Sequence, residues 1–559
     1  MHLSKVVGEE ELEKLLRKLH GKKYGAYKRL RGVVFSYDIA EATFTKIQGD
    51  PYAPPSILEI TIPPSVHGLP SKFFDERSVT PFLDFITREL YLSSVKLRKK
   101  CGTGNSGYLG IPKPGPWILR RSCTEVSGRN IILRLFVGLP ARGRKILGNM
   151  ALEILLDKIP EIVKSTILRP DIEERIEEHV ENYLDQEYLR EWLYENGYAA
   201  FVADGSILPR ESSYSQKPMK NAIPFRSPRE LRVKVELPSG KIVTGMAMPM
   251  GFIVITGGGY HGKTTLLEAI QDGIYDHVKG DGRELVVSRR LTVTVKAEDG
   301  RIVHHVDISS FISDLPKKRS TEDFSSLDAS GSSSMAASIN ESIEAGAEIL
   351  LIDEDTSATN LLYKDDVMAK IIRREPITPL SSQGRSIIEK TGIGIIAVAG
   401  ASSSLIQNAN EVILMENYEP VRITEEAKQY VIEPINEAEY KPPKRRIFYG
   451  IRGLRKVKAV GFKLMAKYED GTVFELDLSR YPRIVEKGQV ALIAHALMNL
   501  KRSTKPMYVS ELVKHVNKLF KEGGFQAFAD PVPPNLTAID GFDLAWVLNR
   551  LHNLSLIHI

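Results

Sequence analysis

The chain has 559 residues, of which 42% are hydrophobic and 26% are charged, and its formal net charge is +6. A chain of this length holds more than one hydrophobic core, so we expect a folded protein of about three or four domains. Its longest apolar runs, such as 392–401 (GIGIIAVAGA), reach about half of the roughly twenty residues that cross a bilayer, which excludes transmembrane helices and indicates buried strands.

The cysteines and the first residues predict the compartment. Only Cys101 and Cys123 are available for disulfides in the whole sequence. The opening MHLSKVVGEEELEK has acidic residues where a signal peptide has a basic segment followed by an apolar one. We therefore expect a reducing, cytoplasmic location and no membrane partner.

The first half of the chain divides into two predicted segments. Residues 1–165 combine an amphipathic helix near 9–19 with several strand-like runs, which predicts an α+β domain. Residues 166–235 begin with a charged helix at about 171–198. The Ser/Pro-rich stretch 206–228 that follows is either a linker or an ordered surface loop.

The second half also divides into two predicted segments. Residues 236–440 alternate strand-like and helical stretches, the pattern of an α/β domain. Residues 441–559 begin with a basic, strand-rich piece and a hairpin at 469–471, and continue with helices near 487–500, 508–521 and 541–553. The predicted fold is thus an α/β core between an N-terminal and a C-terminal α+β domain.

A phosphate-binding loop is predicted at 257–264, which reads GGGYHGKT. It follows the strand-like run 252–256 (FIVIT) and precedes a helix, so backbone N–H groups, a lysine and a hydroxyl meet where a triphosphate and Mg²⁺ would bind. A chance glycine-rich turn is the bland alternative, and this order of strand, loop and helix disfavours it. The predicted nucleotide-binding residues are Gly257, Gly258, Gly259, Tyr260, His261, Gly262, Lys263, Thr264 and Thr265.

A second element is the apolar strand 349–354 (ILLIDE), which ends in two carboxylates. We expect Asp353 and Thr264 to hold Mg²⁺. The predicted catalytic residues are Glu354, which polarises the water that attacks the γ-phosphate, and Lys263, which reaches the β- and γ-phosphates. Such an acidic pair is weak evidence alone. Its place about ninety residues after the phosphate loop, within reach of the same sheet, strengthens it.

A third element is 329–333 (ASGSS), which leads into a helix-compatible stretch at 335–345. Small residues at a helix start present N–H groups to an anion, whereas in the bland reading Ser332 and Ser333 simply cap the helix. Together with the following 357–360 (SATN), the order of elements resembles the ABC ATPase plan, in which the small residues are the signature and the last element is the D-loop. The predicted signature contacts are Ser330, Gly331, Ser332 and Ser333.

Longer stretches narrow this resemblance to the family called predicted ATPases of the ABC class, which includes a subunit of a kinetoplastid mitochondrial RNA-binding complex. The similar segments are 24–32, 49–56, 138–146, 280–287, 306–316, 329–360 and 548–551. The resemblance implies an ABC core at 236–440 with family-specific flanking domains, ATP-dependent formation of a homodimer and, in the best understood member, RNA binding along a basic pore.

Two departures from the general ABC plan affect the expected mechanism. Gly400 stands where most ABC proteins have the switch histidine that contacts the γ-phosphate. The Q-loop glutamine is also missing, because Gln271 lies too close to the phosphate loop, and Asp307 is a candidate substitute. Slow turnover, or ATP acting as a conformational clamp, is therefore expected.

The ABC plan also predicts the assembly. Its sites are composite, since the phosphate loop and acidic pair of one subunit close on the signature of another. This chain has one of each, so we expect a homodimer with two ATP sites, tightened by ATP and loosened by hydrolysis. The soluble engine of a membrane transporter is a disfavoured alternative because of the large extra domains.

Two basic blocks predict a nucleic-acid partner. Residues 91–150 contain 12 Lys or Arg against one acidic residue, and 441–463 contain 9 against none. Lys and Arg contact phosphates, and Trp117 beside them could stack on a base, although a solvated basic face with Trp117 in the core fits equally well. With the family resemblance, RNA or another single strand is favoured. The candidate contacts are Arg120, Arg121, Arg142, Arg144 and Lys145.

Overall fold

The fold is described from a computed structural model, which describes residues 5–315, 320–364, 371–372, 374–400, 402–431, 437–501 and 505–558. By packing, the chain forms two compact units. The first contains Met1–Leu184, Glu486–Leu492 and Gly523–Ala538, and the second contains Asp185–Val485, Ile493–Glu522 and Ile539–Ile559. This division does not follow chain order, because two stretches of the predicted C-terminal segment pack with the N-terminal one.

A seven-stranded sheet forms the centre of the first unit, in the order β1-β2-β3-β4-β7-β5 with β6 paired to β7. All of its pairs are antiparallel except β1 with β2. In β3, Ala40, Ala42 and Phe44 alternate inward, the period of a half-buried strand. The strands are β1 (Lys5–Val7), β2 (Val33–Tyr37), β3 (Ala40–Lys46), β4 (Ser56–Ile62), β5 (Leu109–Gly110), β6 (Thr124–Ser127) and β7 (Asn130–Val137).

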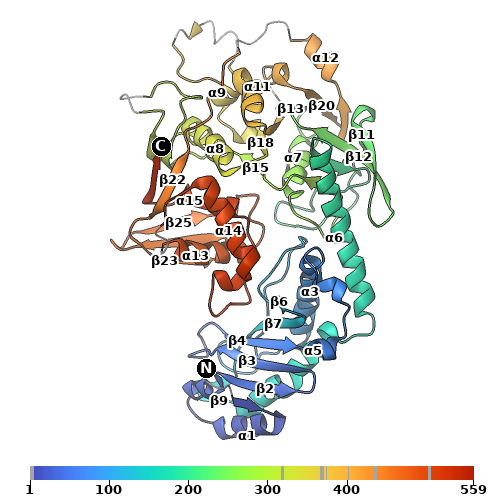
Figure 1. The fold of residues 1–559 in the computed structure, drawn as a ribbon, viewed down its shortest axis with the longest axis vertical. Coiled ribbons are helices and arrows are strands. Elements are labelled where there is room, and N and C mark those ends of the chain that lie inside the picture. The colour runs from blue at the N-terminus through green and yellow to red at the C-terminus, as the bar shows by residue number, and fades with distance from the viewer. Residues whose placement is uncertain are drawn as a thin grey trace. The chain divides into compact units, whose positions relative to one another are not determined.

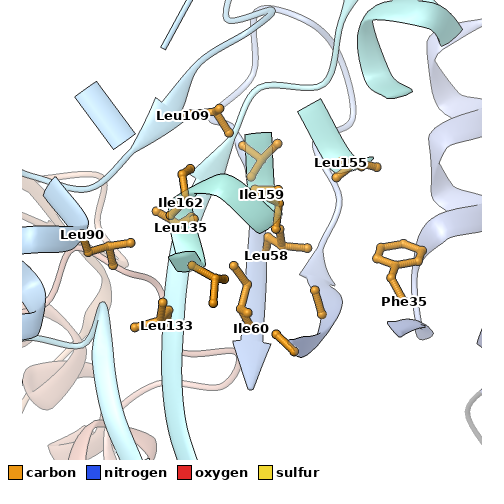
Figure 2. Close-up of a cluster of buried hydrophobic side chains, with 14 of the residues drawn as sticks. Phe35, Leu58, Ile60, Leu90, Leu109, Leu133, Leu135, Leu155, Ile159 and Ile162 are labelled. Carbon is orange, nitrogen blue, oxygen red and sulfur yellow. The ribbon is translucent and has the colours of Figure 1, made fainter. Parts of the chain in front are cut away.

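Helices cover this sheet and complete the core. The helix predicted at 9–19 is α1 (Glu9–Leu19), which buries Leu12, Leu16 and Leu19 at helical spacing. Figure 2 shows side chains of β2, β4 and β7 meeting Leu90 of α3 and Ile159 and Ile162 of α5. The other helices are α2 (Pro64–His67), α3 (Val79–Leu97), α4 (Gly148–Leu152) and α5 (Ile159–Ile167), and β8 (Ala141–Arg142) and β9 (Lys145–Ile146) form a small separate hairpin.

The second unit is built on a six-stranded sheet in the order β15-β18-β19-β13-β20-β21 (Figure 1). Its first five strands are parallel, and β21 joins antiparallel to β20. Covered on both faces, the inner strands are continuous apolar runs, which is why the sequence revealed them. The six strands of the sheet are β13 (Phe252–Thr256), β15 (Thr292–Val295), β18 (Ile349–Asp353), β19 (Gly394–Val398), β20 (Glu411–Glu416) and β21 (Glu419–Arg422).

An antiparallel sheet, β11-β12-β10-β14, shares a core with the parallel one. Val202 and Met246 of this sheet belong to the same buried cluster as Leu266 and Ile270 of α7 and Ile253 of β13. The elements are α6 (Ile172–Glu195), β10 (Tyr198–Ala203), β11 (Arg232–Glu236), β12 (Ile242–Pro249), α7 (Lys263–Asp272) and β14 (Val286–Ser288). The predicted 206–228 stretch is an ordered loop, closed by Phe225 N–H donating to the Ser206 carbonyl at 2.8 Å.

The remaining core elements surround these sheets. They are β16 (Arg301–Val306), β17 (Phe324–Ala329), α8 (Gly331–Ala345), α9 (Thr359–Leu362), α11 (Leu380–Thr391) and α12 (Thr424–Gln429). In α8 the helix begins four residues earlier than the predicted 335–345. An α/β core with a central parallel sheet is thus confirmed.

The described C-terminal residues form two three-stranded sheets, and the three helices that the sequence predicts follow the strand-rich piece. The expected hairpin at 469–471 joins β24 to β25, and Gly471 adopts φ +88° in its turn. The third helix ends earlier than predicted, at Leu548. The elements are β22 (Arg446–Ile451), β23 (Leu454–Val460), β24 (Lys463–Tyr468), β25 (Val473–Asp477), α13 (Lys487–Leu500), β26 (Met507–Tyr508), α14 (Val509–Gly523), α15 (Gly541–Leu548) and β27 (Leu554–His558).

Within the described ranges, no helix combines the length and the apolar character that a membrane span requires.

Candidate nucleotide-binding site

Three loops meet at the carboxyl edge of the parallel sheet. The predicted phosphate loop follows β13, the acidic pair ends β18, and Gly400 follows β19. Since β18, β19 and β13 are consecutive neighbours in the sheet, the loops after them lie side by side. The carboxyl edge of such a sheet is where α/β proteins bind their ligands.

The glycines of the phosphate loop allow its shape. Gly257 adopts φ +138°, and a Cβ atom there would lie 2.3 Å from the carbonyl oxygen of Met415. Gly262 adopts φ +92° and begins α7, whose N-terminal N–H groups and dipole favour an anion. The Lys263 ammonium donates to the carbonyls of Gly257 at 2.7 Å and Gly258 at 2.6 Å, so it lies across the loop.

The two predicted Mg²⁺-binding residues contact each other. The Thr264 hydroxyl donates to a carboxylate oxygen of Asp353 at 2.9 Å. Asp353 is only 5% exposed, and its other oxygen accepts the N–H of Asp355 at 3.1 Å. A hydroxyl and a carboxylate held together are oxygen donors of the kind Mg²⁺ prefers, so these residues fit the ion.

Glu354 is held beside Gly400, whose strand β19 lies between β18 and β13 in the sheet. One of its carboxylate oxygens accepts the Gly400 N–H at 2.6 Å, and the other accepts the Tyr363 hydroxyl at 3.2 Å. A Cβ atom on Gly400 would lie 3.8 Å from Glu354 Oε2 and 3.8 Å from Lys263 Cε. Gly400 therefore stands beside both predicted catalytic residues, where the sequence places the missing switch histidine.

The predicted signature residues differ in accessibility. Ser330 is the N-cap of α8, and its hydroxyl accepts the Ser333 N–H at 3.4 Å. Ser333 itself is buried, whereas Gly331 and Ser332 are half-buried. Helix capping is thus carried out by Ser330 and not by Ser332 or Ser333, which corrects the bland alternative.

The signature and D-loop segments touch within one chain. The Ser332 hydroxyl donates to the side-chain carbonyl of Asn360 at 2.8 Å. Nearby, the Ala297 N–H donates to the Thr356 carbonyl at 3.0 Å. The two segments that ABC sites place at a subunit interface therefore form one surface.

Asp307, the candidate substitute for the Q-loop glutamine, lies after a strand that is not part of the parallel sheet. It follows β16, which forms a two-stranded sheet with β17, and its carboxylate accepts the N–H and hydroxyl of Ser309. Lys296 instead follows β15, the neighbour of β18, at the site's edge of the sheet. Burial raises the pKa of Glu268 on α7, and Arg283 and Lys296 oppose that rise, so Lys296 lies near the phosphate-binding helix.

Sequence reasoning missed Lys296 and Tyr363 for different reasons. Lys296 is not a glutamine, so the ABC plan does not single it out, and only its place at the end of β15 could have identified it. Tyr363 carries no motif, and its contact with Glu354 depends on the fold of the intervening D-loop.

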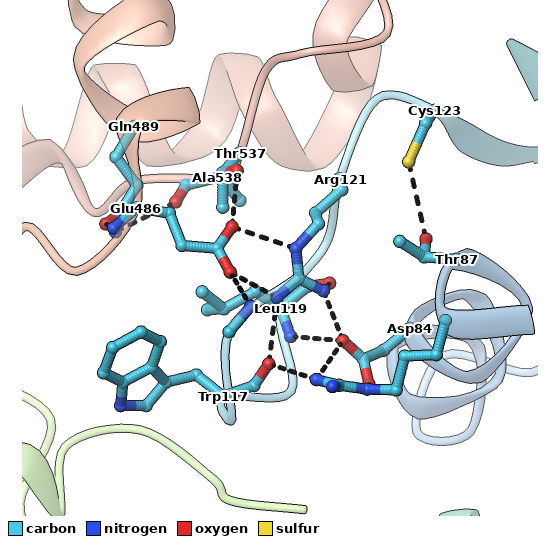
Figure 3. A network of polar contacts seen from close by, with 12 residues as sticks. Asp84, Thr87, Trp117, Leu119, Arg121, Cys123, Glu486, Gln489, Thr537 and Ala538 are labelled. Atoms are coloured by element: carbon cyan, nitrogen blue, oxygen red, sulfur yellow. Dashed lines mark hydrogen bonds and ion pairs between the residues drawn. The ribbon is translucent and has the colours of Figure 1, made fainter. Parts of the chain in front are cut away.

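The candidate nucleic-acid residues fall into two groups. Arg142, Arg144 and Lys145 are exposed on the β8–β9 hairpin, with Arg144 paired to Asp50 at 3.2 Å. Arg121 is only 4% exposed and pairs with Asp84 and Glu486 (Figure 3). Its assignment as a nucleic-acid contact is wrong, because its guanidinium is committed to buried carboxylates.

Two neighbours of Arg121 are also interior. Trp117 is 4% exposed, so it is the core residue of the bland reading and not a stacking platform. Arg120 is half-buried, and burial lowers its pKa. Within the first basic block the three candidate contacts of the hairpin are exposed, and so are Lys96, Arg98, Lys99 and Lys100 at and just after the end of α3. Lys22 and Lys23 are exposed too and pair with the hairpin through the backbone.

Three family models match the chain in succession. Residues 9–169 match the model described as ATPase of the ABC class N-terminal, residues 172–449 match the P-loop domain of the ABC ATPase model, and residues 462–557 match the MRB1590 C-terminal domain. The P-loop match contains the site described above.

Comparisons with individual proteins say less about the family than the three family models do. An uncharacterized protein of Methanocaldococcus jannaschii is 39% identical over 189 residues, which are 32% of this chain and 42% of that protein, so the chain spans less than half of this relative. A bacterial Atm1-family ABC exporter, solved with ATP bound, is 12% identical over 50% of this chain and 49% of its own, with a TM-score of 0.23, which does not establish a shared fold. On the three family matches, the chain belongs to the family of ABC-class ATPases.

Proposed function

We propose that this protein is a homodimeric ATPase that binds ATP with Mg²⁺ at two subunit-shared sites and couples that cycle to binding of RNA or another single-stranded nucleic acid. The observation that carries the proposal is the position of Glu354 and Lys263. Both lie beside Gly400, with the Thr264–Asp353 pair on the same sheet edge.

Binding of the triphosphate begins with the phosphate loop. The Lys263 ammonium exchanges its contacts with the Gly257 and Gly258 carbonyls for the β- and γ-phosphates. N–H groups at the start of α7 contact the same oxygens. Thr264 and Asp353 would hold Mg²⁺, which would supply positive charge to the phosphate oxygens.

Hydrolysis depends on Glu354. Its carboxylate orients and polarises a water molecule against the γ-phosphate, and the Gly400 N–H and Tyr363 hydroxyl fix the direction of the carboxylate. No imidazole occupies position 400, so the γ-phosphate lacks the cationic contact that a switch histidine provides. Slow turnover follows.

The dimer follows from the signature surface. Gly331 and Ser332, with Asn360 beside them, present partly exposed backbone and hydroxyl groups at the start of α8. A second copy closing on the phosphate loop brings these groups to the γ-phosphate. ATP then stabilises the closed dimer because it contacts both halves.

Glu354→Gln tests the proposal in the full-length protein. We expect ATP hydrolysis to fall at least about 100-fold, because the amide no longer accepts a proton from water, while ATP binding persists. Sedimentation with ATP and Mg²⁺ should then show an accumulated dimer. Glu389→Gln, on the exposed side of α11, removes the same charge elsewhere and should change neither result.

The same experiment tests a second candidate function, a nucleotide-gated clamp with almost no turnover. The glycine at position 400 favours this candidate. Wild-type protein that dimerises with ATP yet hydrolyses it no faster than the Glu354→Gln variant supports the clamp. If the variant hydrolyses at a normal rate and forms no dimer, Glu354 does not have this role.

A further inference from the structure

Two tyrosines at the nucleotide site have left-handed backbone conformations: Tyr260 lies within the phosphate loop, and Tyr418 lies in the turn between β20 and β21. Tyr260 adopts φ +64° and Tyr418 adopts φ +71°. Asparagine accounts for most of the other non-glycine residues with positive φ among those described, and its side chain tolerates the conformation. A tyrosine does not, and such strain concentrates at functional sites.

Burial of the rings does not compensate for this strain. Tyr260 is 97% exposed and Tyr418 is 52% exposed. Large aromatic side chains normally stabilise a protein by removing apolar surface from water, and these two leave much of it in solvent. Their rings are therefore available to a ligand.

Tyr418 is held against the phosphate loop by its hairpin. Asn417 and Tyr418, both at positive φ, form the turn between β20 and β21, a position where Asn-Gly is the usual pair. The Asn417 N–H donates to His261 Nδ1 at 2.8 Å. Tyr418 Cδ1 lies 3.2 Å from the point where a Cβ on Gly262 would be, so a side chain there would crowd the ring, and the φ of +92° at Gly262 also favours glycine.

The order of the strands gives the bound nucleotide a direction. On one side of β13 lie β19 and β18, which carry Gly400 and the acidic pair and so receive the γ-phosphate and Mg²⁺. On the other side lie β20 and β21, which carry Tyr418. A triphosphate with its γ end at Glu354 directs its nucleoside end toward the β20–β21 turn.

We propose that the exposed face of Tyr418 is the surface on which the nucleobase of the bound purine nucleotide stacks, with Gly262 providing the space that lets the ring lie beside the phosphates. The inference rests on the proposed ATP site. Stacking uses the π-face that every base has, so this platform discriminates little between adenine and guanine.

The test compares ATP with inorganic tripolyphosphate, each with Mg²⁺, binding to the full-length protein by calorimetry. Tyr418→Gly removes the ring and suits the backbone at φ +71°, so it does not put the fold at risk. We expect ATP binding to weaken roughly tenfold, the contribution of one base–aromatic stack, and tripolyphosphate binding to stay the same. Tyr418→Phe should keep wild-type affinity for both ligands.

A control and three contrary outcomes complete the test. Tyr449→Gly, at a ring that is 44% exposed on β22, should leave both affinities unchanged. If Tyr418→Gly binds ATP as the wild type does, or weakens both ligands equally, Tyr418 is not the base platform. If Tyr260→Gly alone produces the ATP-specific loss, the platform lies on the phosphate loop and the assignment to Tyr418 is wrong. Wild-type protein that binds neither ligand overturns the ATP site itself as well as this inference.

Discussion

At the scale of single residues, Gly400 has the largest consequence for rate. Its backbone N–H contacts Glu354, and the space in front of its Cα opens toward Glu354 and Lys263. A Cβ atom on Gly400 would lie at an ordinary contact distance of 3.8 Å from its nearest atoms, so the first atom of a side chain fits at the position where most ABC proteins have a histidine.

Gly400→His is therefore expected to raise the rate of ATP hydrolysis by about tenfold or more, since a donor aimed at the γ-phosphate stabilises the charge that develops on it. Steady-state hydrolysis measures the effect. Gly400→Ala is the control, because it makes the same backbone less flexible without adding an imidazole, and it should not accelerate turnover. A histidine variant that is no faster than wild type would show that the missing contact does not limit the rate.

Arg121 shows what residue-level prediction from sequence lacks. It stands in a block of 12 basic residues, yet its partners Asp84 and Glu486 are 37 and 365 positions away. Burial opposes its charge, but Glu486 and Asp84 keep the pKa of Arg121 above its ordinary value. A run of basic residues predicts an exposed basic patch only if those residues have no acidic partners elsewhere in the sequence. Arg121 has two such partners.

At the scale of elements, the β8–β9 hairpin carries the three candidate nucleic-acid contacts that are exposed, Arg142, Arg144 and Lys145. Its backbone is fastened to the preceding segment, with Tyr24 N–H donating to the Arg144 carbonyl at 2.8 Å and Ile146 N–H donating to the Lys22 carbonyl at 2.9 Å. The hairpin therefore presents its charges on a fixed frame, and substitutions at its exposed side chains leave that frame in place.

Replacing Arg142, Arg144 and Lys145 together by Glu should abolish most single-strand binding. Because these three side chains would no longer neutralise phosphates, the slope of log affinity against log salt is expected to become shallower by about 2, measured by fluorescence anisotropy with a labelled RNA oligonucleotide. Replacing Lys514, Lys518 and Lys521 of α14 by Glu changes the net charge equally and should have a much smaller effect. Equal losses in the two variants would mean that net charge, and not the hairpin, governs binding.

Elements built from local pattern were predictable, and those that need distant pairing were not. The strands β13 and β18 are apolar runs, α7 follows a glycine turn, and α1 repeats leucines at helical spacing. By contrast, β10 pairs with both β12 and β14 across long intervals of chain. Nothing in a strand's own sequence identifies such partners.

At the scale of the whole molecule, each of the two units is built from three separate segments of the chain. Glu486–Leu492 and Gly523–Ala538 pack with the N-terminal residues, where Glu486 accepts from Arg121 and Thr537 (Figure 3). The C-terminal family domain is therefore not a separate appendage, although it follows the core in the sequence. Domain boundaries read along a chain assume that each segment packs mainly with itself, and this chain does not meet that condition.

Ser330 has a structural role in the helix and a proposed functional role in the dimer. As the N-cap of α8 it stabilises the helix, and in the proposed dimer it faces the partner's γ-phosphate. Ser330→Ala removes both roles and is expected to lower the free energy of unfolding by about 1 kcal/mol.

Ser330→Asp separates the two roles, because aspartate caps a helix as well as serine does but brings a negative charge to the phosphate. We expect this variant to have wild-type thermal stability and to lose ATP-dependent dimerisation in sedimentation experiments. Ser330→Asn is the matched control, since it caps without the charge and should still dimerise. An aspartate variant that is stable and dimerises normally with ATP would restrict Ser330 to capping and place the partner's phosphate elsewhere.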